Sequence, residues 1–239
     1  MTIVIKMNKK ILRICAVIWG ISGVTILVSV IYPIASYEIE SRMKYPELIS
    51  PVVKGSSTFN NLDYTKASNW FPKAAEADKF TSDKVTYYTI SIPALGIYRA
   101  TVSIGGEDLA DSLIQYPGTQ VPGKIGNSVI FGHSILPYFF NPKDYLSIFS
   151  TLPKLKRGDE VYVNYDGISY KYEVESMFEV KPENIQILAQ DTANSYLSLV
   201  TCTPPGHPLK PKRLIVRARL IPTTDSSDFI KQTNANISN

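Results

Sequence analysis

The longest hydrophobic pattern in the chain is an uncharged run of 24 residues, from Ile14 to Tyr37. About 20 apolar residues suffice to cross the hydrocarbon core of a bilayer as a helix, so this run is long enough to span it with some tilt. Four cations and no acid precede the run, whereas charges of both signs follow it. The positive-inside rule therefore predicts a transmembrane signal-anchor over residues 14–37, with residues 1–13 in the cytoplasm and the rest outside the cell.

A cleaved signal peptide is the alternative interpretation of the same run. Its apolar core would cover only about 7 to 15 residues and would end in a site with small residues at alternate positions. The run in this chain is longer, and Pro33-Ile34-Ala35 is a poor match to such a site. We therefore favour an uncleaved anchor. Because no second apolar span follows, we expect a single-pass membrane protein.

Residues 38–84 are polar and interrupted by prolines, which is typical of an extracellular stalk. Within this stalk we expect some helix from Lys66 to Lys79, where Trp70 and Phe71 dock on the domain that follows. We interpret Trp70 as a packing contact in preference to a lid. At the other end of the chain, residues 223–239 form a polar tail.

From residue 85 the pattern changes to short β-branched and aromatic runs separated by Gly and Pro turns. Asp166-Gly167, flanked by alternating residues, predicts a hairpin with a type I′ turn. Residues 107–115 are expected to form one or two helical turns instead. Several short strands without a long amphipathic helix predict an all-β, closed barrel over residues 85–222. The predicted strands cover residues 85–92, 98–104, 128–133, 159–165, 168–174, 196–201 and 213–221.

The composition agrees with a globular domain that carries one very apolar segment, since 44% of the residues are hydrophobic and 19% are charged. The 15 Tyr, 16 Pro and 13 Gly favour short strands and turns over helices. The net charge of +4 is modest, and the Lys and Arg residues are scattered without interleaved aromatics. This distribution argues against nucleic-acid binding.

The chain has two cysteines, Cys15 and Cys202, and the predicted membrane separates them. Cys202 is then a lone thiol in an oxidising compartment, where a structural role gains nothing from sulfur. It ends a β-branched run, and Pro204-Pro205 directs the chain out of the sheet just after it. The next strand begins with Arg213. A thiol at a strand end beside a cationic strand is a candidate nucleophile, although, taken alone, a buried core cysteine is the more common case.

His133 and His207 are the two histidines of the chain. His133 ends a buried strand, as Cys202 does, whereas His207 lies in a Pro-Gly-His-Pro loop. We therefore take His133 as the candidate base and Arg213 as the candidate oxyanion stabiliser, with Arg217 on the same face of the strand as the alternative. Such a trio supports acyl transfer: the thiolate attacks a peptide carbonyl, the imidazole protonates the leaving amine and the guanidinium holds the negative oxygen.

Residues 85–221 resemble the sortases, the cysteine transpeptidases of Gram-positive cell surfaces. Ser198-Leu-Val-Thr-Cys202 is similar to the family's Thr-Leu-x-Thr-Cys signature, with Ser in place of the first Thr. Ile92-Pro-Ala-Leu-Gly-Ile97 is similar to its opening Ile-Pro-x-Leu-x-Ile motif. Because several independent motifs agree in their order, the resemblance is specific. The further landmarks are Pro117-Gly-Thr119, Pro122-Gly123, Gly126-Asn127, Gly132-His133, Phe149-Ser-Thr-Leu152, Gly158-Asp159 and Lys212-Arg213.

The resemblance implies an eight-stranded β-barrel with a catalytic site made of Cys202, His133 and Arg213. Thr201 is expected to contact substrate or to help place the arginine. Some sortases bind calcium through carboxylates just before the histidine strand, but residues 122–128 of this chain contain no acid. We therefore expect no metal, because calcium needs several carboxylate ligands. The resemblance implies no other cofactor.

Two features depart from the family's pattern. The segment 134–146 after the histidine is longer than usual, so we expect the shape of the site to differ there. Pilus-building sortases often carry an Asp-Pro-aromatic lid and a second, C-terminal membrane helix. This chain has Asn69-Trp70-Phe71-Pro72 and a polar C-terminus instead, which argues against pilus polymerisation.

The implied function is that of a membrane-anchored transpeptidase. It would cut a secreted protein at an LPxTG-like sorting signal, hold the fragment as a thioester on Cys202, and pass it to an amine of a cell-wall precursor or a protein lysine. Two alternatives stay open. One is a hydrolase of the same fold, in which water resolves the thioester. The other is an anchored β-domain that only binds, with Cys202 buried.

Overall fold

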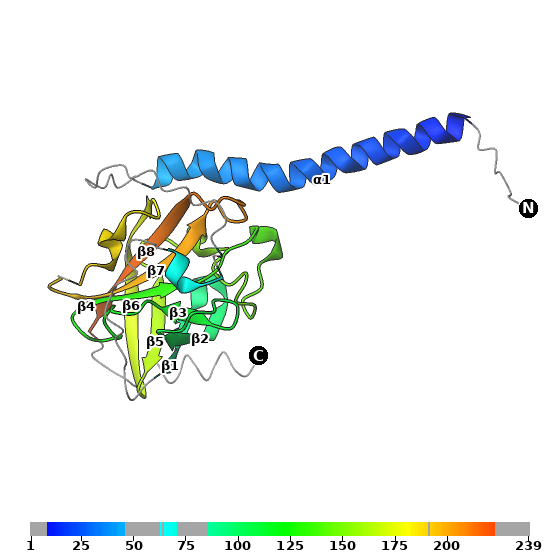
Figure 1. The fold of residues 1–239 in the computed structure, drawn as a ribbon. Coiled ribbons are helices and arrows are strands. Elements are labelled where there is room, and N and C mark those ends of the chain that lie inside the picture. Colours follow the sequence, from blue (N-terminus) through cyan, green and yellow to red (C-terminus); the bar gives the residue numbers. More distant parts are fainter. Residues whose placement is uncertain (1–8, 46–62, 64, 71–85, 191, 223–239) are drawn as a thin grey trace, which may run out of the picture.

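The computed structural model describes residues 9–45, 63, 65–70, 86–190 and 192–222. Within these residues the chain forms one long helix and a closed barrel of eight strands (Figure 1). The elements are α1 (Lys9–Lys44), β1 (Tyr87–Ile92), β2 (Ile97–Ile104), β3 (Leu113–Gln115), β4 (Gly126–Phe131), β5 (Glu160–Tyr165), β6 (Ile168–Val180), β7 (Ser195–Thr203) and β8 (Lys212–Ile221). Short 3₁₀ helices lie in the connections: η1 (Ala67–Trp70), η3 (Pro93–Leu95), η4 (Pro137–Phe139), η5 (Leu152–Lys154) and η6 (Ile185–Leu188). The predicted tail, from residue 223 on, lies outside the described residues.

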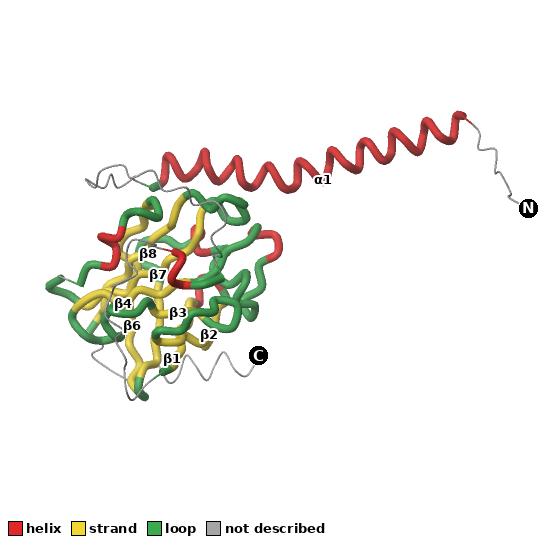
Figure 2. Tube along the Cα trace, viewed as in Figure 1, coloured by secondary structure: helices red, strands yellow, loops and turns green. Residues whose placement is uncertain are grey.

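The strands follow the order β1, β2, β3, β4, β7, β8, β6, β5 around the barrel, and β5 pairs with β1 to close it (Figure 2). The β2–β3 and β4–β7 pairs are parallel, and the other pairs are antiparallel. Because closure leaves no edge strand, every strand can satisfy its backbone hydrogen bonds inside the sheet. The all-β, eight-stranded barrel predicted from the sequence is confirmed.

The β5–β6 hairpin turns where the sequence places it. Asp166 and Gly167 both have a positive φ, of 51° and 75°, and positive φ at both central positions is what a type I′ turn requires. β6 continues past the predicted end to Val180, with a register shift between Val174 and Ser176. A bulge of this kind bends the strand, so that its second half pairs along β8 as far as the Val180–Arg213 pair.

Two local predictions differ from the structure. Residues 107–115 do not form helical turns throughout, because Leu113 to Gln115 pair in parallel with β2 as the strand β3. The buried Gln115 side chain accepts a hydrogen bond from the Tyr88 hydroxyl at 2.8 Å, which satisfies a polar group inside the sheet. Of the helix expected from Lys66 to Lys79, the described part is only the single turn η1, and residues 71–79 lie outside the described part of the chain.

The buried hydrophobic side chains form two clusters. The larger one fills the barrel. The second joins η1 to β3, β4, β6, β7 and β8, and contains Trp70, Phe131, Val200, Cys202 and Ile215 among its members. Cys202 therefore belongs to a packed cluster that the η1 segment completes.

Helix α1 is longer than the predicted anchor, because it begins at Lys9 and continues to Lys44 without a break. By length and composition it is apolar enough to cross a membrane, and its apolar side chains are exposed. In Figure 1 its N-terminal part extends away from the barrel, whereas its C-terminal part lies along one end of it. The segment after residue 37 continues the helix, stabilised by an i,i+4 pair between Glu38 and Arg42.

The carboxylate of Glu179, in β6, connects α1 to the ends of β7 and β8. One of its oxygens accepts hydrogen bonds from the Tyr37 hydroxyl at 2.8 Å and from the Thr203 hydroxyl at 2.9 Å. Its other oxygen lies 3.2 Å from Nζ of Lys212, which also lies 3.1 Å from Glu38. Burial alone would lower the pKa of Lys212, but the carboxylates of Glu179 and Glu38 raise it above its usual value. The ammonium group therefore stays charged and holds the helix and two strands together.

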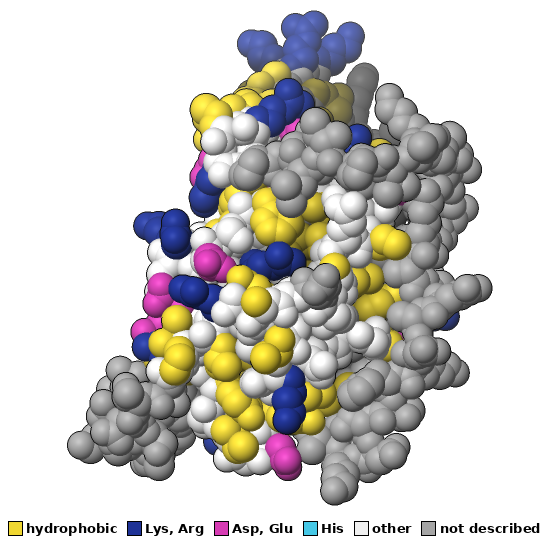
Figure 3. Space-filling model, turned by 90° about the vertical axis from the view of Figure 1, so that its left-hand side faces the viewer, with side chains coloured by type: hydrophobic (Ala, Val, Ile, Leu, Met, Phe, Trp, Pro, Cys, Tyr) yellow, Lys and Arg dark blue, Asp and Glu magenta, His cyan; other side chains and the backbone are white. Residues whose placement is uncertain are grey.

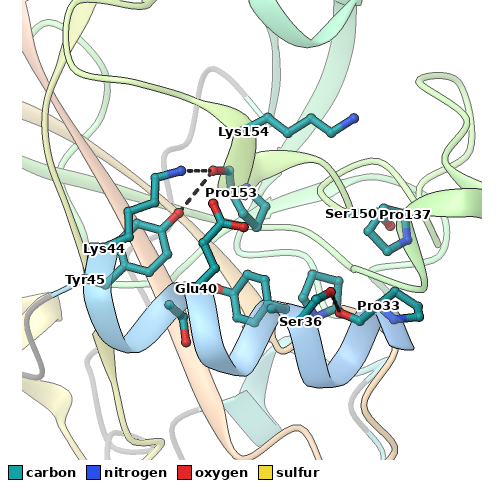
Figure 4. Close-up of a pocket in the computed structure, with 12 residues that line it drawn as sticks. Pro33, Ser36, Glu40, Lys44, Tyr45, Pro137, Ser150, Pro153 and Lys154 are labelled. Carbon is teal, nitrogen blue, oxygen red and sulfur yellow. Dashed lines mark hydrogen bonds between the residues drawn. The ribbon is translucent and has the colours of Figure 1, made fainter. Parts of the chain in front are cut away.

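A second contact fixes the end of the helix. The ammonium group of Lys44 and the hydroxyl of Tyr45 both donate to the carbonyl oxygen of Pro153, at 2.9 and 3.0 Å (Figure 4). A cavity of about 270 Å³ lies between α1 and the barrel here, lined by Pro33 of the helix and Pro137 of the barrel among others. Two separate polar contacts set the direction of α1 on the barrel.

Figure 3 shows the face of the molecule that looks away from the N-terminal part of α1. In its described part, Lys and Arg side chains alternate with Asp, Glu and hydrophobic ones and do not merge into one basic stripe. The positive charge of the chain is thus dispersed on this face.

Candidate active site

Strand β7 places Cys202 near its C-terminal end, between β4 on one side and β8 on the other. The end of the barrel at which β7 ends and β8 begins is called the functional end below. In the antiparallel β7–β8 pair, Cys202 lies directly opposite Arg213. Residues opposite each other in such a pair have their β-carbons about 4.5–5.5 Å apart, so the register brings the thiol and the base of the arginine side chain together. Cys202 is 1% exposed and Arg213 is completely buried.

His133 reaches the same place from β4. The parallel β4–β7 register pairs Phe131 with Val200, and beyond β4 the hydroxyl of Thr201 donates to the carbonyl oxygen of Gly132 at 2.8 Å. Just beyond this bond, the hydroxyl of Ser134 donates to the carbonyl oxygen of Cys202 at 2.7 Å. These bonds continue the pairing past the strand end, so that the segment with His133 runs alongside the segment with Cys202.

Gly132 makes this approach possible. A β-carbon at this position would lie 2.4 Å from the Phe149 ring and 2.6 Å from Leu113, closer than packed atoms allow. Any larger residue would displace the backbone just before His133. The sequence indicated a small residue here, and the structure shows which side chains require it.

Arg213 is held by backbone oxygens. Its Nη1 donates to the carbonyl oxygens of Lys210 at 2.9 Å and Lys212 at 3.1 Å. The alternative candidate, Arg217, pairs with Ser198 in the register, and its guanidinium lies between the rings of Tyr196 and Phe178, at 5.5 and 5.7 Å from their centroids. The register places Arg213, and not Arg217, opposite the cysteine.

Trp70 of η1 covers the site. Its ring stacks on Phe131 at 5.2 Å between centroids, lies 5.9 Å from the His133 ring and is 5.4 Å from the guanidinium carbon of Arg213. Its exposed fraction is 0%, so this ring is itself buried and fills the space beside the histidine and the arginine. We expected Trp70 to dock on the domain as a packing contact. It does pack there, but the surface that it packs on is the candidate active site itself.

Burial changes the chemistry of His133. Burial, together with the positive charge of Lys210, lowers the pKa of His133 to about 4, against the weaker opposing effect of Asp108 and Asp63. Its Nε2 is buried and has no hydrogen-bond partner among the described residues. The imidazole is therefore neutral at physiological pH in this covered arrangement.

The remaining sequence candidates lie in less direct positions. His207 lies in the loop between β7 and β8, is partly exposed, and its Nδ1 accepts a hydrogen bond from the Leu209 amide at 3.1 Å. Thr201 is completely buried and its hydroxyl is engaged with Gly132, which is a structural contact; its predicted contact with substrate stays a prediction. Sequence reasoning did not identify Ser134 as part of the site, although a hydroxyl directly after His133 was visible in the chain.

We predict that Trp70→Ala increases the rate at which a small thiol reagent modifies Cys202, because it removes the ring that covers the site. The rate is measured by mass spectrometry on the full-length protein in detergent. Trp19→Ala is the matched control, since Trp19 is 79% exposed on α1 and covers nothing. Equal labelling rates in the wild type and in Trp70→Ala would contradict the cover.

A second prediction concerns acid stability. Because the buried His133 resists protonation, the unfolded chain binds the proton first as the pH falls below the usual pKa of 6.5. Stability should therefore be full above pH 6.5 and fall between pH 6.5 and 4, with a His133 contribution on the order of 3 kcal/mol. Chemical unfolding at a series of pH values measures this. His133→Gln should flatten the fall, whereas His207→Gln should keep the wild-type slope; the same slope in all three proteins would refute the assignment.

Comparison with known proteins agrees with this geometry. The family model of the sortase domain matches residues 90–221, which is more than half of the chain. Sortase A of Bacillus anthracis is 27% identical over 200 residues, 82% of this chain and 89% of the relative. Sortase A of Streptococcus agalactiae serotype III is 27% identical over 124 residues, 52% of this chain; the chain thus spans only 48% of this relative's length.

Solved structures give the same result for the fold. The crystal structure of a mutant of sortase C-1 from S. pneumoniae matches with a TM-score of 0.50 and 27% identity, covering 58% of this chain and 68% of that chain. The residues that the family model matches, 90–221, include Cys202 and its two candidate partners, His133 and Arg213. The predicted resemblance is confirmed, and the chain belongs to the sortase family of cysteine transpeptidases.

Proposed function

We propose that this protein is a membrane-anchored transpeptidase with Cys202 as nucleophile, His133 as proton donor and acceptor, and Arg213 as oxyanion stabiliser. The observation that carries the proposal is the convergence of three strand ends: β7 with the cysteine, β8 with the arginine opposite it, and β4 with the histidine beside it. The substrate would be a secreted protein with an LPxTG-like sorting signal. The acceptor would be an amine of a cell-wall precursor or of a protein lysine.

The chemistry follows from the three groups. Transfer of the Cys202 proton to His133 gives a thiolate, which attacks the carbonyl carbon of the scissile peptide bond. Arg213 stabilises the negative charge that develops on the carbonyl oxygen. His133 then gives its proton to the leaving amine, which leaves the acyl fragment as a thioester on Cys202. An acceptor amine attacks the thioester, His133 takes up the amine proton, and the thiol is regenerated as the new amide forms.

The covered arrangement does not favour the first of these steps. A histidine with a pKa of about 4 is a poor acceptor for a thiol proton. Displacement of Trp70 by substrate would let water and the substrate amide reach the ring, which raises its pKa toward the usual value. We therefore assign the described arrangement to a resting state, in which the cover also protects a free thiol in an oxidising compartment.

The location follows from α1. A helix of this length and composition suits a single-pass anchor, and the basic N-terminal flank favours a cytoplasmic N-terminus with the barrel outside the cell. The activity can be tested with the full-length protein in detergent and a library of sorting-signal peptides, by looking for a covalent adduct on Cys202. An added amine that changes the products distinguishes a transpeptidase from a hydrolase.

We predict that Cys202→Ala abolishes adduct formation and that His133→Ala is nearly as severe. The roles are those of nucleophile and proton carrier, which the remaining residues do not replace. His207→Ala is the matched control and should retain activity, because His207 lies in the β7–β8 loop and its Nδ1 accepts a hydrogen bond from the Leu209 amide. Turnover by Cys202→Ala would refute the mechanism, and an inactive His207→Ala beside an active His133→Ala would reverse the assignment of the base.

We further predict that Arg213→Ala lowers the rate by about 100- to 1,000-fold, the usual cost of losing one oxyanion donor. Arg213→Lys should not restore it fully, because lysine lacks the planar guanidinium. Arg217→Ala should cost much less, since Arg217 lies opposite Ser198 and between two aromatic rings. Steady-state kinetics on the three variants measure this. An active Arg213→Ala with an inactive Arg217→Ala would transfer the role to Arg217.

A further inference from the structure

Two loops at the functional end of the barrel expose large apolar side chains. In η4, Tyr138 is 91% exposed and Phe139 is 61% exposed; in the β7–β8 loop, Leu209 is 72% exposed. The two loops touch, because a β-carbon on Gly206 would lie only 2.6 Å from the Leu136 side chain. The three exposed residues, Tyr138, Phe139 and Leu209, are called the apolar loop surface below.

The apolar loop surface lies beside one particular stretch of α1. Pro33 of α1 lines the first cavity together with Pro137, which begins η4. Ile31 and Ile34 line a second cavity together with Pro208, next to Leu209. Both loops therefore lie level with the last residues of the uncharged run. In Figures 1 and 2 the loop with η4 projects from the barrel on the side toward which the N-terminal part of α1 runs.

The contacts of α1 fix this arrangement. Tyr37 and Glu38 bind the Glu179–Lys212 cluster, and Lys44 binds Pro153, so the helix meets the barrel at two separate points. Two points of contact define the direction of the helix axis relative to the barrel. If the helix crosses a bilayer, the same end of the barrel always faces the lipid.

The chemistry of the loops suits that position. Residues 134–141 contain no charged side chain, and residues 203–209 contain none apart from the titratable His207. Tyrosine and other amphipathic aromatic side chains are enriched at the boundary between lipid and water, where the ring contacts acyl chains and the hydroxyl contacts head groups. Single exposed apolar residues are normal on a protein surface, but three on two adjoining uncharged loops beside a membrane helix call for a partner.

We propose that the apolar loop surface inserts into the lipid–water interface of the membrane that α1 crosses. This inference rests on the proposed membrane anchoring of α1. The occupant is the lipid itself, and the barrel is seated on the outer leaflet by the helix and by both loops together. The loop of η4 begins directly after His133, and the other loop joins Cys202 to Arg213, so the contact holds the candidate active site at the membrane surface.

The test uses the full-length protein, with Cys15→Ser and Cys202→Ala, in vesicles of phosphatidylcholine and phosphatidylglycerol that contain a nitroxide-labelled lipid. A fluorophore is attached to a single introduced cysteine at position 138 or 209. Ile125→Cys is the matched control, because Ile125 is 68% exposed but precedes β4, at the opposite end of that strand from His133. We expect the lipid quencher to reduce the fluorescence at positions 138 and 209 several-fold more than at position 125.

A label at Val24→Cys separates this inference from the anchoring on which it rests. Strong lipid quenching at position 24 with none above the control at 138 and 209 would keep the anchor and overturn the loop contact. No lipid quenching at position 24 would overturn the anchor itself. In the supporting case, Tyr138→Asp combined with Phe139→Asp should abolish the quenching at position 209, whereas Ile125→Asp should leave it unchanged. If the labels at positions 138 and 209 are shielded from solvent only at a high protein-to-lipid ratio, and are not quenched by the lipid, the surface would instead bind a second copy of the chain.

Discussion

The register of β7 between β4 and β8 is the constraint on which the candidate site depends. The antiparallel β8 places Arg213 opposite Cys202, and the parallel β4 ends where His133 can stand beside it. Because side chains alternate between the two faces of a strand, a slip of one residue would turn the thiol to the other face and separate the trio. The hydroxyls of Thr201 and Ser134 each donate to a carbonyl oxygen of the neighbouring segment. These two bonds fix the register where the strands end and the backbone hydrogen bonds of the sheet stop.

Trp70 links the burial of the site to its reactivity. Burial is the main cause of the low pKa of His133, with the charge of Lys210 second, and the Trp70 ring is one of the groups that pack against this histidine and against Arg213. An aromatic ring is suited to this role, since it packs on Phe131 and interacts favourably with the guanidinium at the same time.

Much of the fold could be predicted because its signals are local. The alternation around Asp166-Gly167 and the proline stop after Cys202 are read from a few residues each. β3 was missed because three residues that pair with a distant strand carry no periodicity of their own. The position of Trp70 depends on contacts with Phe131 and Arg213, which are remote in sequence, and a single Trp in a polar segment does not reveal them. The family motifs pointed to the candidate trio, which composition and spacing alone left open.

The shared carboxylate of Glu179 has a practical consequence for how such a domain is cut. Removing the N-terminal helix to obtain a water-soluble protein also removes the phenol of Tyr37, and opens the ends of β7 and β8 to water. Thr203 and Lys212 neighbour the cysteine and the arginine in sequence. In the shortened chain they would still bind Glu179, but this carboxylate would have lost the hydrogen bond from Tyr37 and would be more exposed to water. A shortened chain is thus a chemically altered protein, and differences in its kinetics reflect a changed environment of Glu179 as well as a missing tether.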